Sequence, residues 1–221
     1  MNDEINMNDK INVMIVEDQA MPRQLFGAIV ESCPKLRLVL SIDDAAIADI
    51  CCARHEIDLV LMDVVTKNGA SGLAAAEKIK AQNSRVKIII VTSMPECSYV
   101  ERARKIGVEG FWYKDFSREP ILSLIERVLA GERVYPEETP SISLGLAESS
   151  EFTARELDVL REMTGGFTNA EIAEILGISE KRVRNHVTNM LEKTGFRSRT
   201  ELAVRARETG LVIRDRNEED L

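Results

Sequence analysis

The hydrophobic pattern of this chain changes once along its length, and this change constrains the fold more than any other feature. Over residues 11–131, short apolar runs alternate with stretches whose apolar residues recur at helical spacing. Strands that alternate with helices form a parallel sheet that helices cover on both faces. We therefore predict an α/β domain with a five-stranded parallel sheet. The predicted strands are residues 13–16, 36–42, 59–62, 86–91 and 110–113.

The rest of the chain predicts a linker and an all-helical domain. Residues 132–150 contain two prolines and four acidic residues without a regular period, which is typical of an interdomain linker. Residues 151–213 show only helical spacing. We predict an all-α domain of four helices here and an acidic tail over residues 214–221. The predicted helix caps are Thr153, Thr168, Ser179 and Ser198, and three of them have the capping-box spacing to Glu156, Glu171 and Glu201.

Composition excludes several classes of protein. No run of about 20 apolar residues is present, so we expect no membrane-spanning helix. The N-terminus is polar and acidic rather than a secretory signal, and we expect a cytoplasmic protein. The four cysteines lack CxxC spacing and the chain has two histidines, so we expect free thiols and no zinc site. The net charge of −8 argues against a non-specific nucleic-acid binder.

Polar side chains stand where four of the predicted strands end. Glu17 and Asp18 follow the first strand and Asp63 the third, whereas Thr92 and Lys114 follow the fourth and the fifth. Because the carboxyl ends of parallel strands lie along one edge of a sheet, we expect these side chains to converge. A single acidic residue at a strand end is more often a solvated loop residue or a helix cap. Five such residues at matching strand ends favour a functional site.

The chemistry of this set is consistent with phosphoryl transfer. Clustered carboxylates repel one another and need a counter-charge. Oxygen ligands suit Mg²⁺, a hard ion that uses few carboxylates. Asp63 can then act as a carboxylate nucleophile toward a phosphoryl group, while Lys114 and the Thr92 hydroxyl hold phosphoryl oxygens. The sequence therefore predicts a phosphoryl-transfer site with Mg²⁺ as its cofactor.

Residues 11–131 resemble the receiver domain of bacterial response regulators in the motifs VED, LVLMD, VTS and GFWYK. The resemblance implies a flavodoxin-like (βα)5 fold and a sensor histidine kinase as phosphodonor. The family usually has Met-Pro three residues after its aspartate, where this chain has Thr66-Lys67 and one extra residue. By the resemblance, Asp63 is the phosphoacceptor, Glu17, Asp18, Asp63 and the backbone carbonyl of Val65 are metal ligands, Thr92 and Lys114 contact phosphate, and Phe111 is the switch aromatic.

A basic stretch lies in the second half of the predicted helical domain. Residues 179–199 contain six basic and two acidic residues, although the whole chain is acidic. The apolar residues of the helix that begins there form one stripe, which leaves the other face polar. On that face Arg184 suits guanine, Asn185 suits adenine and Thr188 suits the methyl group of thymine. The residues suited to DNA phosphates are Lys181, Arg182, Lys193, Arg197 and Arg199.

Residues 152–204 resemble the LuxR-type helix-turn-helix of the NarL/FixJ family, from FTAREL to SRTELA. The resemblance implies that residues 180–194 form the recognition helix and that the helix after Ser198 provides the surface of a DNA-bound homodimer. A solvated basic face on an ordinary helical bundle is the alternative interpretation. The capped helix and the glycine turn that precede the basic helix favour DNA binding.

The leading hypothesis is a two-component response regulator. Phosphorylation of Asp63 by a sensor histidine kinase would control homodimerisation and binding to specific double-stranded DNA. The alternative is a DNA-binding regulator whose receiver is not switched, and the altered loop after Asp63 motivates it. An enzyme is the third hypothesis. It is disfavoured because no glycine-rich turn follows the first strand, and because Val65 stands where a phosphohydrolase commonly has its second acid.

Overall fold

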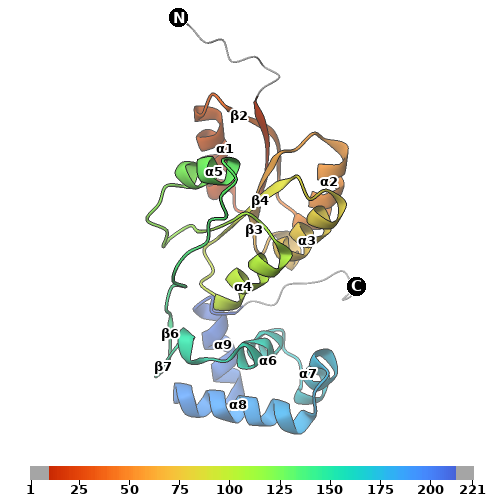
Figure 1. Ribbon diagram of the computed structural model, residues 1–221. Helices are drawn as coiled ribbons and strands as arrows, with labels where there is room; N and C mark the ends of the chain where they lie inside the picture. Colours follow the sequence, from red (N-terminus) through yellow and green to blue (C-terminus); the bar gives the residue numbers. More distant parts are fainter. Residues whose placement is uncertain (1–9, 213–221) are drawn as a thin grey trace, which may run out of the picture. The chain divides into compact units, whose positions relative to one another are not determined.

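The computed structural model describes residues 10–212, and the predicted acidic tail, 214–221, lies outside this range (Figure 1). Contacts between residues divide the chain into two compact units. Within the described range, the first unit holds residues 10–93 and 100–137, and the second holds residues 94–99 and 138–212. The second unit thus includes a short segment from far earlier in the sequence.

The first unit is built on a five-stranded sheet with the order β2-β1-β3-β4-β5 and with every pairing parallel. This confirms the predicted flavodoxin-like α/β fold. The strand order reverses direction between β1 and β3, and in such sheets ligands bind beyond the carboxyl ends of the strands at that point. The strands are β1 (Ile11–Val16), β2 (Leu36–Ile42), β3 (Leu59–Asp63), β4 (Lys87–Thr92) and β5 (Gly110–Tyr113).

Helices cover both faces of this sheet. Figure 1 shows α1 and α5 on one face and α2 and α3 on the other. In α5, four apolar residues at helical spacing, from Ile121 to Val128, are buried against the sheet, which explains why this stretch folds as a helix. The helices are α1 (Ala20–Ser32), η2 (Ala45–Ile47), α2 (Ala48–Arg54), η3 (Lys67–Gly69), α3 (Gly72–Gln82), α4 (Cys97–Ile106) and α5 (Ile121–Leu129).

The segment predicted as a linker, residues 132–150, contains more structure than its composition indicates. Val134 forms a parallel bridge with Gly110 and is buried in the hydrophobic core of the first unit. Further on, β6 (Ser143–Leu144) and β7 (Ala147–Glu148) pair antiparallel, and η4 (Ser149–Glu151) follows them. Strands of two residues are too short to produce a detectable hydrophobic period. The domain boundaries themselves stay a prediction.

The described part of the second unit carries the four predicted helices, whose apolar stripes meet in one core. Gly177 adopts a left-handed conformation (φ 62°) between the second and the third helix, which gives the turn of a helix-turn-helix. The four helices are α6 (Ala154–Thr164), α7 (Asn169–Leu176), α8 (Glu180–Thr194) and α9 (Arg199–Glu208).

Cys33, Cys51 and Cys52, all in the first unit, are free thiols. Among the described residues, no helix has the length and apolar character needed to cross a membrane.

Two of the three predicted capping boxes form completely, at Thr153 and at Thr168. The third box, predicted at Ser198, was half wrong. The Ser198 hydroxyl accepts a hydrogen bond from the Glu201 N–H at 3.1 Å, as a helix cap does. The Glu201 carboxylate instead accepts from the Arg197 N–H at 3.0 Å. The spacing of a capping box therefore fixed the start of the helix but not the partner of its glutamate.

Candidate functional site: an acidic cluster and a basic helix

The sheet brings together carboxylates that are far apart in the sequence. Glu17 follows β1 and Asp63 ends β3, and the two strands are paired neighbours in the sheet. One carboxylate oxygen from each of Glu17, Asp18 and Asp63 lies within 4.8 Å of the others. Glu17 and Asp63 are buried, whereas Asp18 is exposed. The expected convergence of these three residues is therefore present in the structure.

Lys114, which follows β5, reaches across the end of the sheet to this cluster. Its ammonium group donates to Asp63 Oδ2 at 2.8 Å and also pairs with the Glu17 carboxylate. The backbone N–H of Lys114 donates to the carbonyl oxygen of Thr92 at 2.8 Å, so the end of β4 is fixed to the same group. One half-buried ammonium group thus contacts two buried carboxylates, and the exposed Asp18 carboxylate lies beside them, which leaves an excess of negative charge.

This arrangement shifts the ionisation of the buried groups. Burial raises the pKa of Asp63 to about 7, because a carboxylate loses its hydration there, and the nearby Lys114 charge only partly opposes this effect. Burial alone would lower the pKa of Lys114, but the charges and hydrogen bonds of Asp63 and Glu17 outweigh it and raise that pKa. A divalent cation fits such a site, because it would offset the remaining charge with the oxygen ligands that hard cations prefer.

Two backbone contacts hold Asp63 in place. The N–H of Val64 donates to Asp63 Oδ1 at 2.7 Å. Gly72, the first residue of α3, packs so closely that an added Cβ would lie 1.8 Å from the Asp63 carbonyl oxygen. Its N–H donates to the Val64 carbonyl at 2.7 Å. Sequence reasoning missed Gly72, although a glycine at the first position of a helix that follows a functional loop was a usable signal.

The loop between β3 and α3 accommodates its extra residue through backbone conformation and local contacts. Asn68 and Gly69 both have positive φ, at 59° and 77°. The buried Thr66 accepts a hydrogen bond from the Ala45 N–H at 2.8 Å through its hydroxyl oxygen. Val65, whose carbonyl is the predicted metal ligand, forms an isolated bridge with Ser71. The loop is therefore held firmly without the Met-Pro pair that is usual in similar proteins.

The two remaining predicted residues of this site are buried in the sheet beside it. Thr92 ends β4 opposite Tyr113, and Phe111 lies on β5 opposite Ile90. Both side chains are excluded from solvent. The Phe111 ring meets the Tyr113 ring edge-on at 5.0 Å between centroids. The aromatic predicted to act as a switch thus occupies an inward position.

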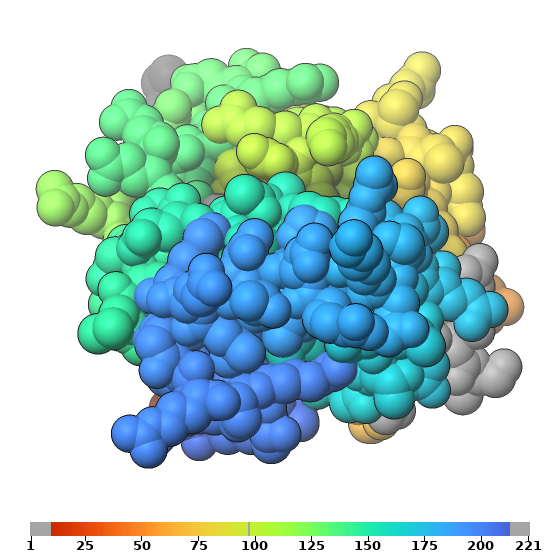
Figure 2. Space-filling view, turned by 90° about the horizontal axis from the view of Figure 1, so that it is seen from below, coloured from red at the N-terminus to blue at the C-terminus, as the bar shows by residue number. Residues whose placement is uncertain are grey.

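The predicted DNA-reading residues lie on α8. Val183, Val187 and Met190 are buried, which fixes the orientation of the helix. The opposite face is exposed, and Figure 2 shows the blue side chains of this region uncovered on one side of the second unit. Arg184 forms an exposed ion pair with Glu180 at 2.9 Å, a contact that is weak and easily exchanged. The exposed predicted residues are Lys181, Arg182, Arg184, Asn185, Thr188 and Arg197.

Two of the residues predicted to contact phosphate have partners inside the second unit instead. Lys193 is half-buried and pairs with Glu156 of α6 at 2.7 Å. Arg199 is half-buried and donates to Asn169 Oδ1 at 2.6 Å and to the Phe167 carbonyl. Both contacts join helices of the same core. The predicted contacts of Lys193 and Arg199 with DNA stay predictions, and the structure gives each residue a second role.

Comparison with known proteins covers both units. Residues 13–126 match the response regulator receiver domain, and residues 150–206 match the luxR family of bacterial regulatory proteins. The chain belongs to the response regulators, with a receiver domain and a LuxR-type DNA-binding domain. Its relatives in the NarL/FixJ family are transcriptional regulators rather than enzymes, so the enzyme hypothesis is not supported.

Three similar proteins illustrate the relationship. The nitrate/nitrite response regulator protein NarP of Escherichia coli is 34% identical over 194 residues, which cover 85% of this chain and 90% of NarP. The transcriptional regulatory protein DesR of Bacillus subtilis is 32% identical over 201 residues, which cover 90% of this chain and 98% of DesR. The structure of RcsB from Salmonella enterica serovar Typhimurium, bound to promoter rprA, superposes with a TM-score of 0.60 at 17% identity. It covers 89% of this chain and 98% of RcsB, and it supports the fold alone.

The acidic cluster of this response regulator is typical of the Mg²⁺ site of receiver domains. A receiver domain also implies a kinase as partner. The cluster could be predicted from the sequence because each member lies at the end of a strand or just after it. Gly72 was missed, because the close approach of that residue to Asp63 depends on how the start of α3 packs against the end of β3.

Proposed function

We propose that phosphorylation of Asp63 by a sensor histidine kinase switches this response regulator into a homodimer that binds specific double-stranded DNA and regulates transcription in the cytoplasm. The observation that carries the proposal is the meeting of Glu17, Asp63 and Lys114 at the ends of three strands. Buried groups with shifted pKa values cluster at functional sites, which favours a site for a phosphoryl group and a cation over a structural ion pair.

The transfer needs little more than positioning. A carboxylate oxygen of Asp63 attacks the phosphorus of the kinase's phosphohistidine, the P–N bond breaks as the new P–O bond forms, and the leaving imidazole takes a proton from solvent. The N–H of Val64 and the ammonium group of Lys114 hold the two carboxylate oxygens, at 2.7 and 2.8 Å. Lys114 and the Thr92 hydroxyl then contact oxygens of the transferred group.

Glu17, Asp18 and Asp63 are the residues that would hold Mg²⁺, with the backbone carbonyl of Val65 as a further ligand. Bound Mg²⁺ supplies positive charge to the phosphoryl oxygens. Support comes from the donor set, because three carboxylates lie within 4.8 Å of one another and two of them contact Lys114. Asp18 is exposed and can reach a partly hydrated ion, which is how Mg²⁺ usually binds.

The acyl phosphate adds negative charge beside β4 and β5. In the proposed switch, the Thr92 hydroxyl moves toward the phosphate and the inward position of Phe111 is favoured. A local charge thereby biases an element that has two arrangements. The parallel pairing of these strands supports this step, because a shift of Thr92 is transmitted directly to its partner residue Tyr113.

The phosphorylated form would read DNA through α8, and we propose α9 as the dimer surface on DNA. Arg184, Asn185 and Thr188 would contact base edges, while the flanking basic residues would contact phosphates and set the register. The exposure of these side chains on α8 supports the assignment. So does the match of residues 150–206 to the luxR family.

Intact-mass spectrometry after incubation with Mg²⁺ and acetyl phosphate tests the switch. The wild-type protein should gain one phosphoryl group, and Asp63→Asn, which keeps the size of the side chain, should gain none. Phosphorylated wild type should also bind a selected DNA site more tightly than the unphosphorylated protein. Equal phosphorylation of both proteins would contradict Asp63 as the acceptor.

A second candidate function is a DNA-binding regulator whose receiver is not switched by phosphorylation. The β3–α3 loop favours it, since Thr66-Lys67 and one extra residue stand beside the acceptor, and Lys67 pairs with Asp43 at 3.3 Å. This alternative predicts no phosphoryl gain with folded protein and Mg²⁺ present, and the same DNA affinity with and without phosphodonor. A phosphorylation-dependent gain in DNA affinity would eliminate it.

A further inference from the structure

The hairpin of β6 and β7, which lies in the segment predicted as a linker, is packed into the second unit. Leu144 and Ala147 are buried in the hydrophobic core of that unit. On the exposed side of the hairpin, the hydroxyls of Ser141 and Ser143 both donate to the Glu148 carboxylate, each at 2.6 Å. The hairpin is therefore joined to the core by its inner side chains and braced by its outer ones.

The tip of this hairpin meets the last turn of α8. Gly145 has a positive φ of 66°, and a Cβ added there would lie 2.2 Å from the Thr194 carbonyl oxygen. The Leu146 N–H donates to the same oxygen at 3.0 Å, which satisfies a carbonyl that the end of a helix leaves without an intrahelical partner. A Cβ added at Gly195, which also has a positive φ, would lie 2.9 Å from the Leu146 side chain. Two glycines therefore permit this close contact.

The contact with the hairpin gives α8 an anchor at each end. At its start, α8 follows the left-handed turn at Gly177 and is capped by Ser179, whose hydroxyl accepts from the Arg182 N–H at 3.3 Å. At its end, the hairpin tip is joined by Lys193, which donates to the Glu151 carbonyl at 2.8 Å. The buried stripe decides which face of α8 is exposed, and the two anchors fix the tilt of the helix. The exposed residues predicted to read bases lie between the anchors.

We propose that the β6–β7 hairpin is a positioning element for DNA recognition, in which Gly145 and the Leu146 N–H hold the end of α8 in the orientation that reads bases. The DNA-binding module then begins near Ser141, before residue 150, where the match to the luxR family starts. This inference rests on the proposed function, because α8 must be the helix that reads DNA. Hydrogen bonds weaken steeply at poor angles, so a small tilt of α8 reduces base reading more than it reduces the attraction of charges to phosphates.

Gly145→Ala in the full chain tests the inference. The measurements are the Kd for a double-stranded site selected with the wild-type protein and the Kd for a duplex of scrambled sequence, both after incubation with Mg²⁺ and acetyl phosphate. We expect the preference for the selected site to fall at least about tenfold, which is within the range for the loss of one base contact. Binding to the scrambled duplex should stay within about twofold of wild type and keep its salt dependence, because the charge of the protein does not change.

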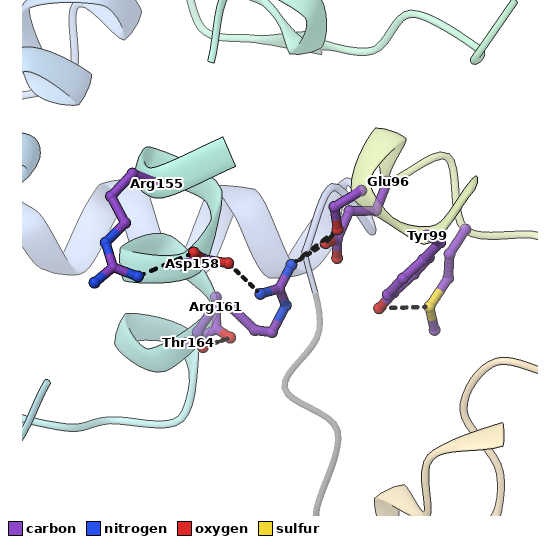
Figure 3. Close-up of polar contacts among 8 residues, drawn as sticks. Glu96, Tyr99, Arg155, Asp158, Arg161 and Thr164 are labelled. Atoms are coloured by element: carbon purple, nitrogen blue, oxygen red, sulfur yellow. Dashed lines mark hydrogen bonds and ion pairs between the residues drawn. The ribbon is translucent and has the colours of Figure 1, made fainter. Parts of the chain in front are cut away.

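Two controls separate positioning from strain and from lost stability. Gly210→Ala is the control for strain, since Gly210 lies in the same unit with a φ of 67° and no atom of the described residues lies within 4 Å of an added Cβ. Asp158→Asn is the control for stability. Asp158 pairs with Arg155 and with Arg161, which also pairs with Glu96, and these pairs involve neither the hairpin nor α8 (Figure 3). Both controls should keep the preference for the selected site within about twofold of wild type.

Three results would overturn the positioning role. A preference for Gly145→Ala within about twofold of wild type would do so and would leave the proposed function intact. An equal loss in either control would assign the effect to strain or stability. An equal loss in Leu146→Ala, whose side chain is 85% exposed, would show that the hairpin tip contacts DNA itself. Wild-type protein that binds both duplexes equally would overturn the reading of bases by α8, and this inference with it.

If Gly145→Ala does not fold, as judged by thermal unfolding, the double variant Ser141→Ala/Ser143→Ala decides. It removes both hydroxyl donors to Glu148, which loosens the hairpin without changing any residue that contacts α8. The preference for the selected site should then fall by a smaller factor of about three, because hydrogen bonds of exposed groups contribute little. An unchanged preference in this double variant would overturn the inference.

Discussion

The acidic cluster and the DNA-reading face of α8 are built in opposite ways. The cluster takes Glu17, Asp63 and Lys114 from the ends of three different strands and buries both carboxylates. The DNA-reading face takes its exposed residues from a single helix. The cluster therefore exists only when the whole sheet is folded, whereas α8 needs only its buried stripe to present the other face. A substitution far from the cluster in sequence can destroy the cluster. A substitution on the exposed face of α8 should affect little beyond the contact of that residue.

The strongest test of this difference is Gly72→Ala. The added Cβ would meet the Asp63 carbonyl oxygen at 1.8 Å, so the end of β3 or the start of α3 must move. We expect the first unit to lose about 3 kcal/mol of unfolding free energy, as overpacked cores do. We also expect little or no phosphoryl gain from acetyl phosphate. Chemical denaturation and intact mass measure the two effects.

Gly27→Ala is the matched control, since Gly27 lies inside α1. A Cβ at that position would meet only Leu38 Cδ2, at 3.7 Å, which is an ordinary contact. Alanine in a helix interior is favoured over glycine, so the stability should rise by about 0.5–1 kcal/mol and phosphorylation should not change. If both alanines behave alike, the close approach of Gly72 to Asp63 does not matter.

Replacing Lys114 with glutamine should have the next largest effect. The ammonium group contacts both Asp63 and Glu17, and it is the cation that would stabilise the charge of the transferred phosphoryl group. We expect the rate of phosphorylation by acetyl phosphate to fall about 100-fold, the usual loss when one preorganised group of this kind is removed. Arg127→Gln, at an exposed ion pair on α5, should leave the rate unchanged.

Substitutions on α8 should affect DNA binding and leave phosphorylation as it was. Arg184→Ala should lose about 1–3 kcal/mol of discrimination at one base pair. Lys181→Ala should weaken binding to all sequences and reduce the slope of log K against log salt by about 0.9. Binding titrations over a range of salt, on a selected site and on single-base variants, separate the two. Equal losses on every sequence for Arg184→Ala would show that this residue contacts phosphate.

The contrast between the two sites also explains what the sequence could predict. Each strand end could be recognised from the local sequence, so Glu17, Asp63 and Lys114 could be placed at one edge of the sheet from the sequence alone. The exposed face of α8 could be predicted from the spacing of the apolar residues Val183, Val187, Met190 and Leu191.

What the sequence missed are contacts between remote segments. Neither Glu96 nor Arg161 belongs to a pattern that marks it, and the two residues meet only through the packing of the 94–99 segment on α6. The contact of Lys193 with α6 was missed for the same reason. The position of Lys193 beside the basic residues indicated phosphate, whereas its partner Glu156 lies 37 residues earlier in the chain.

The smallest expected effect concerns this Lys193–Glu156 pair. Burial alone would raise the pKa of Glu156, but hydrogen bonds from Lys193 and Thr153 outweigh it and lower that pKa. The carboxylate therefore stabilises the second unit at pH values above its ordinary pKa of about 4.5, and this contribution is lost as the pH falls through the lowered value. We expect Glu156→Gln to cost about 1 kcal/mol of unfolding free energy at neutral pH, and less toward pH 3.

Denaturant unfolding of wild type and Glu156→Gln between pH 3 and 7 measures this difference. Lys193→Gln should destabilise the second unit by a similar amount at neutral pH, because it removes the other member of the pair. Arg197→Gln is the control, since Arg197 is exposed on the same basic stretch and should change stability by less than about 0.5 kcal/mol. If Lys193→Gln left stability unchanged and only weakened DNA binding, Lys193 would belong with the DNA-contacting residues of α8. The DNA-contacting face would then extend into the last turn of that helix.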